Sequence, residues 1–233
     1  GAEASMIFQE PMTALNPVFT ISSQMTDVLI RHQGMDRKKA RQHAIRMLEK
    51  VGIPSPEGRI DEYPHQLSGG MRQRVMIAMA LSCNPKLLLA DEPTTALDVT
   101  TQAQVMEQIM TLQQETGTAV VLVTHDLAVV AETCDRVVVM YSGTVVEQAP
   151  VDDIFTLPQH PYTEGLLQSI PRLRSQKLAE LPTIPGTVPD LLMLPPGCRF
   201  ADRCYKAVPE CRDSDPRIES DGLRAVACFR PNR

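Results

Sequence analysis

The chain has 233 residues, of which 43% are hydrophobic, and a formal net charge of -5. This length and composition predict one well-packed domain with a small appendage, and the acidic balance disfavours a nucleic-acid surface, which would normally form a basic field. The sequence holds no apolar run of about 18 residues that could span a bilayer, so we expect any membrane contact to come through a partner.

Strand and helix signals alternate from the start of the chain. Residues 5–8 predict a short buried strand that ends at Gln9, and residues 19–84 predict a mainly helical subdomain. Within it, Asp36 is suited to cap a helix that starts at the next residue, and Gly52 is suited to end it.

Residues 67–73 read Leu-Ser-Gly-Gly-Met-Arg-Gln and lead into a helix that we predict from residue 72 to residue 81. Ser68 is suited to cap this helix, and Gly69 and Gly70 let backbone N–H groups approach an anion at its positive end. By itself, the same stretch is also typical of an ordinary N-cap and turn.

The apolar run of residues 87–90 ends in two acids, Asp91 and Glu92. It predicts a buried parallel strand that ends at the sheet edge where α/β proteins place their ligand sites. Asp91 is suited to hold a divalent cation, and Glu92 to orient a water for attack on a phosphoryl group. The alternative, for this stretch alone, is a strand that simply leaves the core.

The elements that follow continue the alternation. Asp98 is a candidate N-cap for a helix over residues 99–115, residues 118–123 predict a β-branched strand, and His125 stands at its end. A short helix over residues 126–134 and an antiparallel hairpin over residues 136–147 come next. The pattern predicts an α/β fold with a mostly parallel sheet wrapped by helices.

Five motifs, in this order, resemble the nucleotide-binding subunit of an ATP-binding cassette (ABC) transporter: residues 8–11, 67–73, 87–92, 96–98 and 123–126. The resemblance implies a P-loop NTPase-like fold with an inserted helical subdomain, and binding of ATP and Mg2+. It implies Glu92 and His125 as catalytic residues, with Asp91 and Gln9 at the Mg2+ ion.

The same resemblance implies that hydrolysis requires two subunits. The nucleotide held by the opposite subunit would be bound by the signature residues Ser68, Gly69, Gly70 and Gln73, and Asp98 would contact that subunit. The segment after Gln9 would face a membrane permease, with candidate groove residues Met12, Leu15, Pro17, Val18 and Phe19.

The sequence contains no phosphate loop of the form G-x-x-x-x-G-K followed by Ser or Thr, which in this family precedes the segment around Gln9. We therefore expect an N-terminally truncated domain, without its first strands and that loop. The fragment by itself is expected to hydrolyse little ATP and to act at most as a metal-binding and docking module.

Beyond residue 150 prolines recur and periodicity fades, so we predict a partial nucleotide-binding domain over residues 1–150 and an irregular extension over residues 151–233. Residues 151–155 and 161–167 predict short helices. Residues 159–167 and 199–233 resemble the C-terminal extension of the oligopeptide, dipeptide and nickel branch of ABC importers.

Four of the six cysteines lie in this extension: Cys198, Cys204, Cys211 and Cys228. Disulfides are disfavoured in the reducing cytosol, and structural zinc sites favour cysteines about two to four residues apart, closer than these. Four thiolates can also hold a 4Fe–4S cluster. The spacing leaves a cluster, zinc and unliganded thiols open, and the resemblance to the peptide-importer branch favours the cluster over zinc.

Together, the motifs and the extension predict the ATPase subunit of a bacterial dipeptide or oligopeptide importer at the cytoplasmic face of the inner membrane. Its implied partners are a second ATPase subunit, identical or different, two membrane permeases and, indirectly, a substrate-binding protein, with no nucleic acid. The alternatives are a nickel or glutathione importer and a non-transport ABC ATPase.

Overall fold

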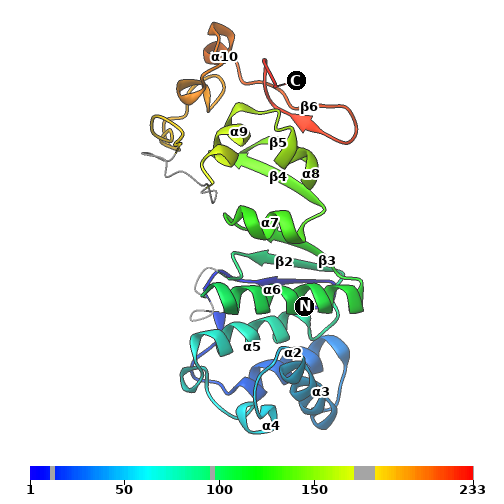
Figure 1. Ribbon diagram of the computed structural model, residues 1–233. Coiled ribbons are helices and arrows are strands. Elements are labelled where there is room, and N and C mark those ends of the chain that lie inside the picture. The colour runs from blue at the N-terminus through cyan, green and yellow to red at the C-terminus, as the bar shows by residue number, and fades with distance from the viewer. Residues whose placement is uncertain (11–13, 95–97, 171–181, 233) are drawn as a thin grey trace, which may run out of the picture. The chain divides into compact units, whose positions relative to one another are not determined.

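The computed structural model describes residues 1–10, 14–94, 98–170 and 182–232, and it divides the chain into two compact units, Gly1–His125 and Asp126–Arg233 (Figure 1). The predicted boundary between residues 150 and 151 stays a prediction. Of the helices in the described ranges, none is long and apolar enough to cross a membrane.

The first unit is built on a three-stranded parallel sheet in the order β1-β2-β3, formed by β1 (Ala4–Ile7), β2 (Leu87–Asp91) and β3 (Ala119–Val123). Ile7 lies opposite Ala90, and Asp91 lies opposite Val123. Because the strands are parallel and in register, their C-terminal ends share one edge of the sheet, as predicted.

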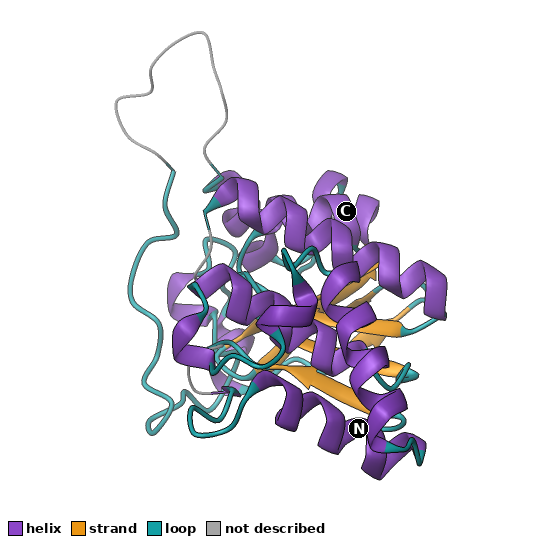
Figure 2. Ribbon diagram, turned by 90° about the horizontal axis from the view of Figure 1, so that it is seen from below, coloured by secondary structure: helices purple, strands orange, loops and turns teal. Residues whose placement is uncertain are grey.

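Helices cover one face of this sheet (Figures 1 and 2). The helices nearest to it are α5 (Gly69–Leu81) and α6 (Val99–Thr116). The remaining elements form the predicted helical subdomain beyond α5: α2 (Ile21–Gln33), α3 (Arg37–Lys50), α4 (Pro56–Arg59) and the 3-10 turn η1 (Pro64–Gln66).

The sequence signals for α3 are confirmed at both ends. Asp36 caps it by accepting a hydrogen bond from the Lys39 backbone N–H at 2.9 Å. Gly52 follows it with φ +73°, a conformation that favours glycine. Between these ends Ala40 and Leu48 are fully buried, because they share the helix face that packs against α2 and α5.

The second unit contains an antiparallel sheet in the order β4-β5-β7-β6. Its strands are β4 (Arg136–Tyr141), β5 (Thr144–Pro150), β6 (Glu219–Ser220) and β7 (Ala225–Val226). Its helices are α7 (Leu127–Thr133), α8 (Val151–Thr156), α9 (Pro161–Gln168), the 3-10 turn η2 (Ala201–Arg203) and α10 (Pro209–Asp213).

The predicted parallel sheet forms as β1-β2-β3, whereas the predicted hairpin belongs to the second sheet. The hairpin β4–β5 forms as predicted, but its free edge pairs with β7 from the far C-terminal region and not with β3. The sequence could not reveal this pairing, because β6 and β7 are two residues long and show no alternation.

The core of the second unit joins the hairpin to the C-terminal extension. Its buried members are Val139, Tyr141, Val146, Ala149, Ile154 and Phe200. Phe200 packs edge-on against Tyr141, with 5.2 Å between ring centroids. The extension therefore shares a hydrophobic core with β4 and β5.

Candidate functional site

Three predicted polar side chains meet at the C-terminal edge of the parallel sheet. Gln9 Nε2 donates to Glu92 Oε2 at 3.1 Å, and His125 Nδ1 lies 3.1 Å from Glu92 Oε1. Gln9 follows β1, Glu92 follows β2 and His125 follows β3, so the central carboxylate is held from both neighbouring strands.

The backbone at Glu92 explains how this carboxylate leaves the strand. Its N–H still donates to the Val123 carbonyl at 2.8 Å, which continues the pairing of β2 with β3. Its φ of +44° then lies in the left-handed region, which is strained for a residue with a side chain and is often found at functional sites. The Glu92 side chain is 22% exposed and that of His125 is 74% exposed, so the group opens to solvent on the His125 side.

Asp91 ends β2 and is partly exposed. It lies on the same sheet face as Leu89, because strand residues two apart share a face. That face carries the exposed apolar side chains of Met6, Leu89 and Val121. On the opposite face, Ile7, Leu88 and Ala90 are buried under the helices.

Three of the four signature residues, Ser68, Gly69 and Gly70, lie at the start of α5, which begins at Gly69 and thus three residues before the predicted start. Ser68 caps the helix by accepting from the Met71 N–H at 3.3 Å, as predicted. A Cβ added at Gly69 would meet nothing within 4 Å, so backbone N–H groups here are open to a ligand.

The fourth predicted signature residue, Gln73, lies elsewhere. Its side chain is buried, and its amide donates to the Pro93 carbonyl. It therefore connects α5 to the turn after Glu92 instead of facing outward beside Ser68. That Gln73 binds nucleotide stays a prediction, made for a buried side chain with one amide N–H already bonded inside the protein.

Two further predicted segments are described only in part. Asp98 caps α6 by accepting from the Thr101 N–H at 3.0 Å, while residues 96 and 97 of the same motif lie outside the described residues.

In the segment predicted to face a permease, the side chains of Val18 and Phe19 are 71% and 51% exposed, and Pro17 is also exposed. Leu15 is buried and so does not line a surface, and Met12 lies outside the described residues.

The four cysteines of the extension line one small cavity of about 20 Å³ in the second unit, together with His160 and Phe200. Burial raises the pKa of Cys198 to about 11, and the three other thiols add to the rise. The pKa values of Cys204 and Cys228 are also raised, mainly by burial. The cysteines, although up to 30 residues apart in sequence, thus share one apolar pocket.

Among residues 1–10, 14–94, 98–170 and 182–232, no group of three or more His, Cys, Asp or Glu side chains is arranged to hold a metal ion. A cofactor in this cavity is therefore treated below as a proposal.

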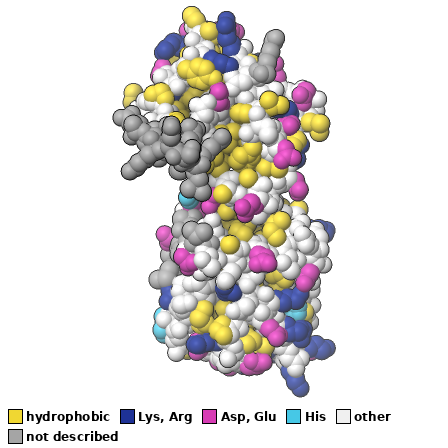
Figure 3. Space-filling model, viewed as in Figure 1, with side chains coloured by type: hydrophobic (Ala, Val, Ile, Leu, Met, Phe, Trp, Pro, Cys, Tyr) yellow, Lys and Arg dark blue, Asp and Glu magenta, His cyan; other side chains and the backbone are white. Residues whose placement is uncertain are grey.

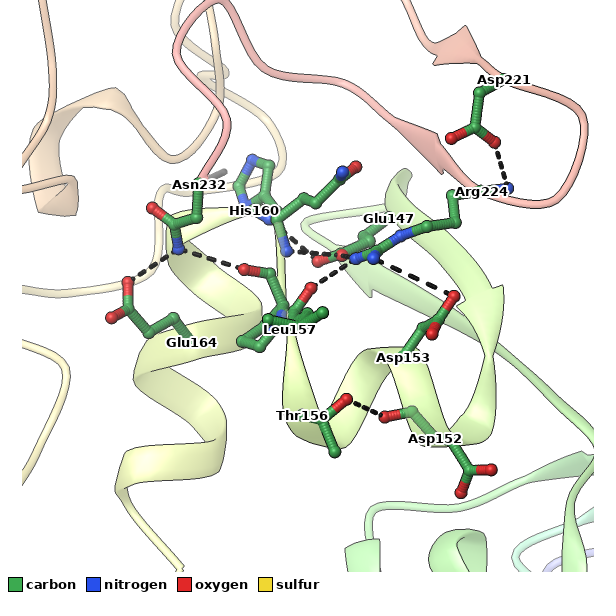
Figure 4. A network of polar contacts seen from close by, with 12 residues as sticks. Glu147, Asp152, Asp153, Thr156, Leu157, His160, Glu164, Asp221, Arg224 and Asn232 are labelled. Carbon is green, nitrogen blue, oxygen red and sulfur yellow. Dashed lines mark hydrogen bonds and ion pairs between the residues drawn. The ribbon is translucent and has the colours of Figure 1, made fainter.

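A polar network that sequence reasoning missed lies beside this cavity (Figure 4). The Glu147 side chain is 1% exposed and accepts from the backbone N–H groups of Gln159 at 2.7 Å and His160 at 2.9 Å. Arg224, immediately before β7, places a guanidinium nitrogen 3.8 Å from Glu147 and also donates to the Leu157 carbonyl. A glutamate inside the valine-rich run of residues 144–150 is the signal that could have indicated a buried charge.

Charged side chains of both signs are interspersed over the face of the molecule in Figure 3. This distribution accords with the mixed composition and net charge of -5.

Comparison with known sequences identifies two matching families. The family described as ABC transporter matches residues 1–95, and the family described as oligopeptide/dipeptide transporter, C-terminal region, matches residues 146–211.

Curated relatives match nearly the whole chain. It is 59% identical over 230 residues to the oligopeptide transport ATP-binding protein AppD of Bacillus subtilis, covering 98% of this chain and 70% of that protein. It is 50% identical over 231 residues to the dipeptide transport ATP-binding protein DppD of Haemophilus influenzae, covering 99% and 70%. It is 51% identical over 229 residues to the oligopeptide transport ATP-binding protein OppD of Salmonella typhimurium, covering 98% and 68%.

Two solved structures share the fold. One is the dimeric ATP-binding cassette MJ0796 in a post-hydrolysis state bound to ADP and Pi, with a TM-score of 0.56 and 32% identity over 64% of this chain and 63% of that chain. The other is cbiO1 from Clostridium perfringens, part of the ABC transporter complex cbiONQ, with a TM-score of 0.58 and 29% identity over 67% and 60%.

Proposed function

The chain belongs to the ATP-binding proteins of oligopeptide and dipeptide ABC transporters, and we propose here how its described residues serve the ATP hydrolysis that powers peptide import. The observation that carries the proposal is the Glu92 carboxylate, whose two oxygens face the Gln9 amide and the His125 ring. A carboxylate fixed in this way at a sheet edge is suited to orient and polarise a water molecule for attack on the γ-phosphate of ATP.

His125 and Asp91 complete the proposed hydrolytic group. His125 turns Nδ1 toward Glu92, which leaves the other end of its exposed ring for the γ-phosphate and the charge that develops there. Asp91 and Gln9 offer the oxygen ligands that Mg2+ prefers, and Mg2+ when bound neutralises phosphate charge.

We propose that the N-terminus of α5 serves the nucleotide of a second subunit. Ser68, Gly69 and Gly70 present backbone N–H groups at the positive end of a 13-residue helix, which favours a phosphate. Asp98, at the exposed start of α6, is proposed to contact the same subunit, which the chain would need as a dimer partner. The solved relative MJ0796 is dimeric, which supports this arrangement.

The proposed membrane partners are two permeases, reached at the cytoplasmic face of the inner membrane, with a substrate-binding protein acting through them. The exposed side chains of Val18 and Phe19 support a permease contact, because exposed apolar residues next to the Gln9 segment gain from burial. Motion at that contact would reach Glu92 through the Gln9 hydrogen bond.

Glu92→Gln tests the hydrolytic proposal in the importer assembled from its intact subunits. We expect ATP turnover and dipeptide uptake to fall by about 10² to 10⁴-fold, because the amide keeps the shape but is a poor base. ATP binding, measured with a fluorescent analogue, should remain. Glu115→Gln, which alters only an exposed pair with Lys50, is the matched control and should leave turnover unchanged. A Glu92→Gln importer that turns over within about twofold of the wild type would refute the assignment of this residue.

For the cavity in the second unit we propose a 4Fe–4S cluster held by Cys198, Cys204, Cys211 and Cys228. Four thiolates that line one cavity can together hold such a cluster, and the resemblance of this extension to the peptide-importer branch favours the cluster over zinc. The apolar surroundings would keep water from the sulfur atoms.

Metal analysis tests this cofactor. The chain purified without oxygen should contain about four irons with a broad visible absorbance, and Cys198→Ser should lose both. Cys83→Ser, at a buried cysteine of the first unit, is the matched control and should keep them. Stoichiometric zinc, or no metal in the wild type, would refute the cluster without affecting the hydrolytic site.

A further inference from the structure

Gln73 is a polar side chain on the buried side of α5. It is 3% exposed, and the buried residues that follow it on the helix include Val75, Met76 and Ile77. Burying an amide costs free energy unless the amide finds a hydrogen-bond partner. A methionine of similar length could pack here without that cost, so the amide needs a further reason.

The partner of the Gln73 amide is the backbone directly after Glu92. Gln73 Nε2 donates to the Pro93 carbonyl, and Pro93 is itself buried. Because Pro93 has no N–H, β2 cannot extend its hydrogen bonding with β3 through this residue. A side chain of α5 therefore satisfies and holds the backbone at the point where strand pairing ends.

The backbone of Glu92 is consequently fixed on both sides. Its own N–H donates to the Val123 carbonyl of β3 at 2.8 Å, and the carbonyl of the next residue, Pro93, is held by Gln73. Between these two bonds lies the Glu92 φ of +44°, a left-handed conformation that a residue with a side chain keeps only where its surroundings impose it. This conformation sets the direction in which the carboxylate leaves β2.

We propose that Gln73 is a positioning residue for ATP hydrolysis, which holds the turn after β2 so that Glu92 keeps the orientation needed to polarise the attacking water. The proposal rests on the hydrolytic role proposed for Glu92 above, and it is separate from the nucleotide contact predicted for Gln73 from the sequence. Because displacement of a catalytic group by about 1 Å can cost about 10²-fold in rate, loss of the bond should lower kcat rather than change KM.

Two substitutions remove this bond in the importer assembled from its intact subunits. Gln73→Met keeps the length of the side chain without a donor, and Gln73→Asn keeps an amide that is one methylene shorter. Ile77→Val, at a fully buried position of the same helix, is the matched control, because it loosens the packing of α5 and leaves the bond in place. The values of kcat and of KM for ATP are measured for each importer, and circular dichroism checks the fold of each variant.

A double-mutant cycle with Glu92→Gln separates positioning from a general structural defect. The slow hydrolysis in this background is followed with radiolabelled ATP. A residue that acts only through Glu92 has nothing left to position once the carboxylate is gone, so its substitution should have little further effect. A structural defect would instead reduce turnover by the same factor in both backgrounds.

We expect both Gln73 variants to lower kcat by about 10 to 10²-fold with KM within about twofold of the wild type, and Ile77→Val to leave both within about twofold. In the Glu92→Gln background the further loss should stay below about twofold. An unchanged kcat, an equal loss in both backgrounds, or unfolding of both Gln73 variants would overturn the positioning role. Wild-type turnover of Glu92→Gln alone would instead remove the hydrolytic proposal and this inference with it.

Discussion

Replacement of Arg224 by methionine is expected to destabilise the second unit by about 3 kcal/mol, because it leaves the Glu147 carboxylate buried without a counter-charge. The charges lie 3.8 Å apart, and their side chains are 1% and 15% exposed. At that distance the attraction is about 4 kcal/mol for an effective dielectric constant near 20, and desolvation and side-chain ordering reduce the net value. The two backbone N–H groups that Glu147 also accepts keep the loss from being larger.

A double-mutant cycle isolates this pair. Glu147→Gln should cost about 2 kcal/mol, since the amide can accept from only one of the two N–H groups, and the double variant should cost less than the sum. Arg212→Met is the matched control, because the Arg212–Asp202 pair is closer, at 2.7 Å, but its side chains are 62% and 74% exposed. We expect its effect to stay below about 1 kcal/mol.

Tyrosine fluorescence during urea unfolding can report on the second unit alone. The chain has no tryptophan and four tyrosines, of which only Tyr63 lies in the first unit, so a Tyr63→Phe background silences that unit. If Arg224→Met proves no more destabilising than Arg212→Met, then burial does not decide the strength of these ion pairs and the reasoning fails.

Three further predictions concern packing and pH. Gly197→Ala should lower the unfolding midpoint and the iron content, because the new Cβ would clash with the Cys211 carbonyl; an unchanged midpoint contradicts this. Leu48→Ala should cost about 2–5 kcal/mol in urea unfolding, since Leu48 is fully buried, and a loss below about 1 kcal/mol would contradict its place in the core. The Arg41 guanidinium lowers the pKa of the Asp61 carboxyl below its usual value of 3.8. The stability that ionised Asp61 gives the folded protein is therefore fully present above pH 3.8, and it is lost as the pH falls through the folded-state pKa. Asp61→Asn should flatten this acid-side loss in thermal melts, and parallel curves for the two proteins would contradict it.

The meeting of Gln9, Glu92 and His125 was predictable from sequence because each of these side chains follows a strand of one parallel sheet. Residues 87–92 predict a buried strand that ends in acids, and the parallel register of the strands brings Gln9 and His125 to the same edge of the sheet as Glu92. The caps of α3 and α6 were likewise predictable, because the interactions of Asp36, Gly52 and Asp98 involve only residues within one helical turn of them. The comparisons confirm the ABC fold that these local signals indicated.

The tertiary arrangement of the second unit could not be predicted in the same way. Glu147, His160 and Arg224 come from a strand, a helix cap and a hairpin, and no spacing in the sequence relates them. Gln73 shows a similar limit inside a recognised motif, because the pattern marks its position on α5 but not that its amide faces the Pro93 carbonyl.

The cavity and the Glu147 network act on the same stretch of backbone. Arg224 immediately precedes β7 and Cys228 follows β7 by two residues, so the proposed cluster, when bound to Cys228, would hold β7 against β5 together with the ion pair at Arg224. A ligand that binds only the folded cavity adds about 2.7 kcal/mol when its concentration is 100 times its Kd. Since that gain is close to the expected cost of Arg224→Met, the loaded variant should be about as stable as the empty wild type. If the proposed cluster is bound, it and the Arg224–Glu147 ion pair would stabilise the pairing of β7 with β5 to a similar degree, and β7 should separate from β5 readily only when both are lost.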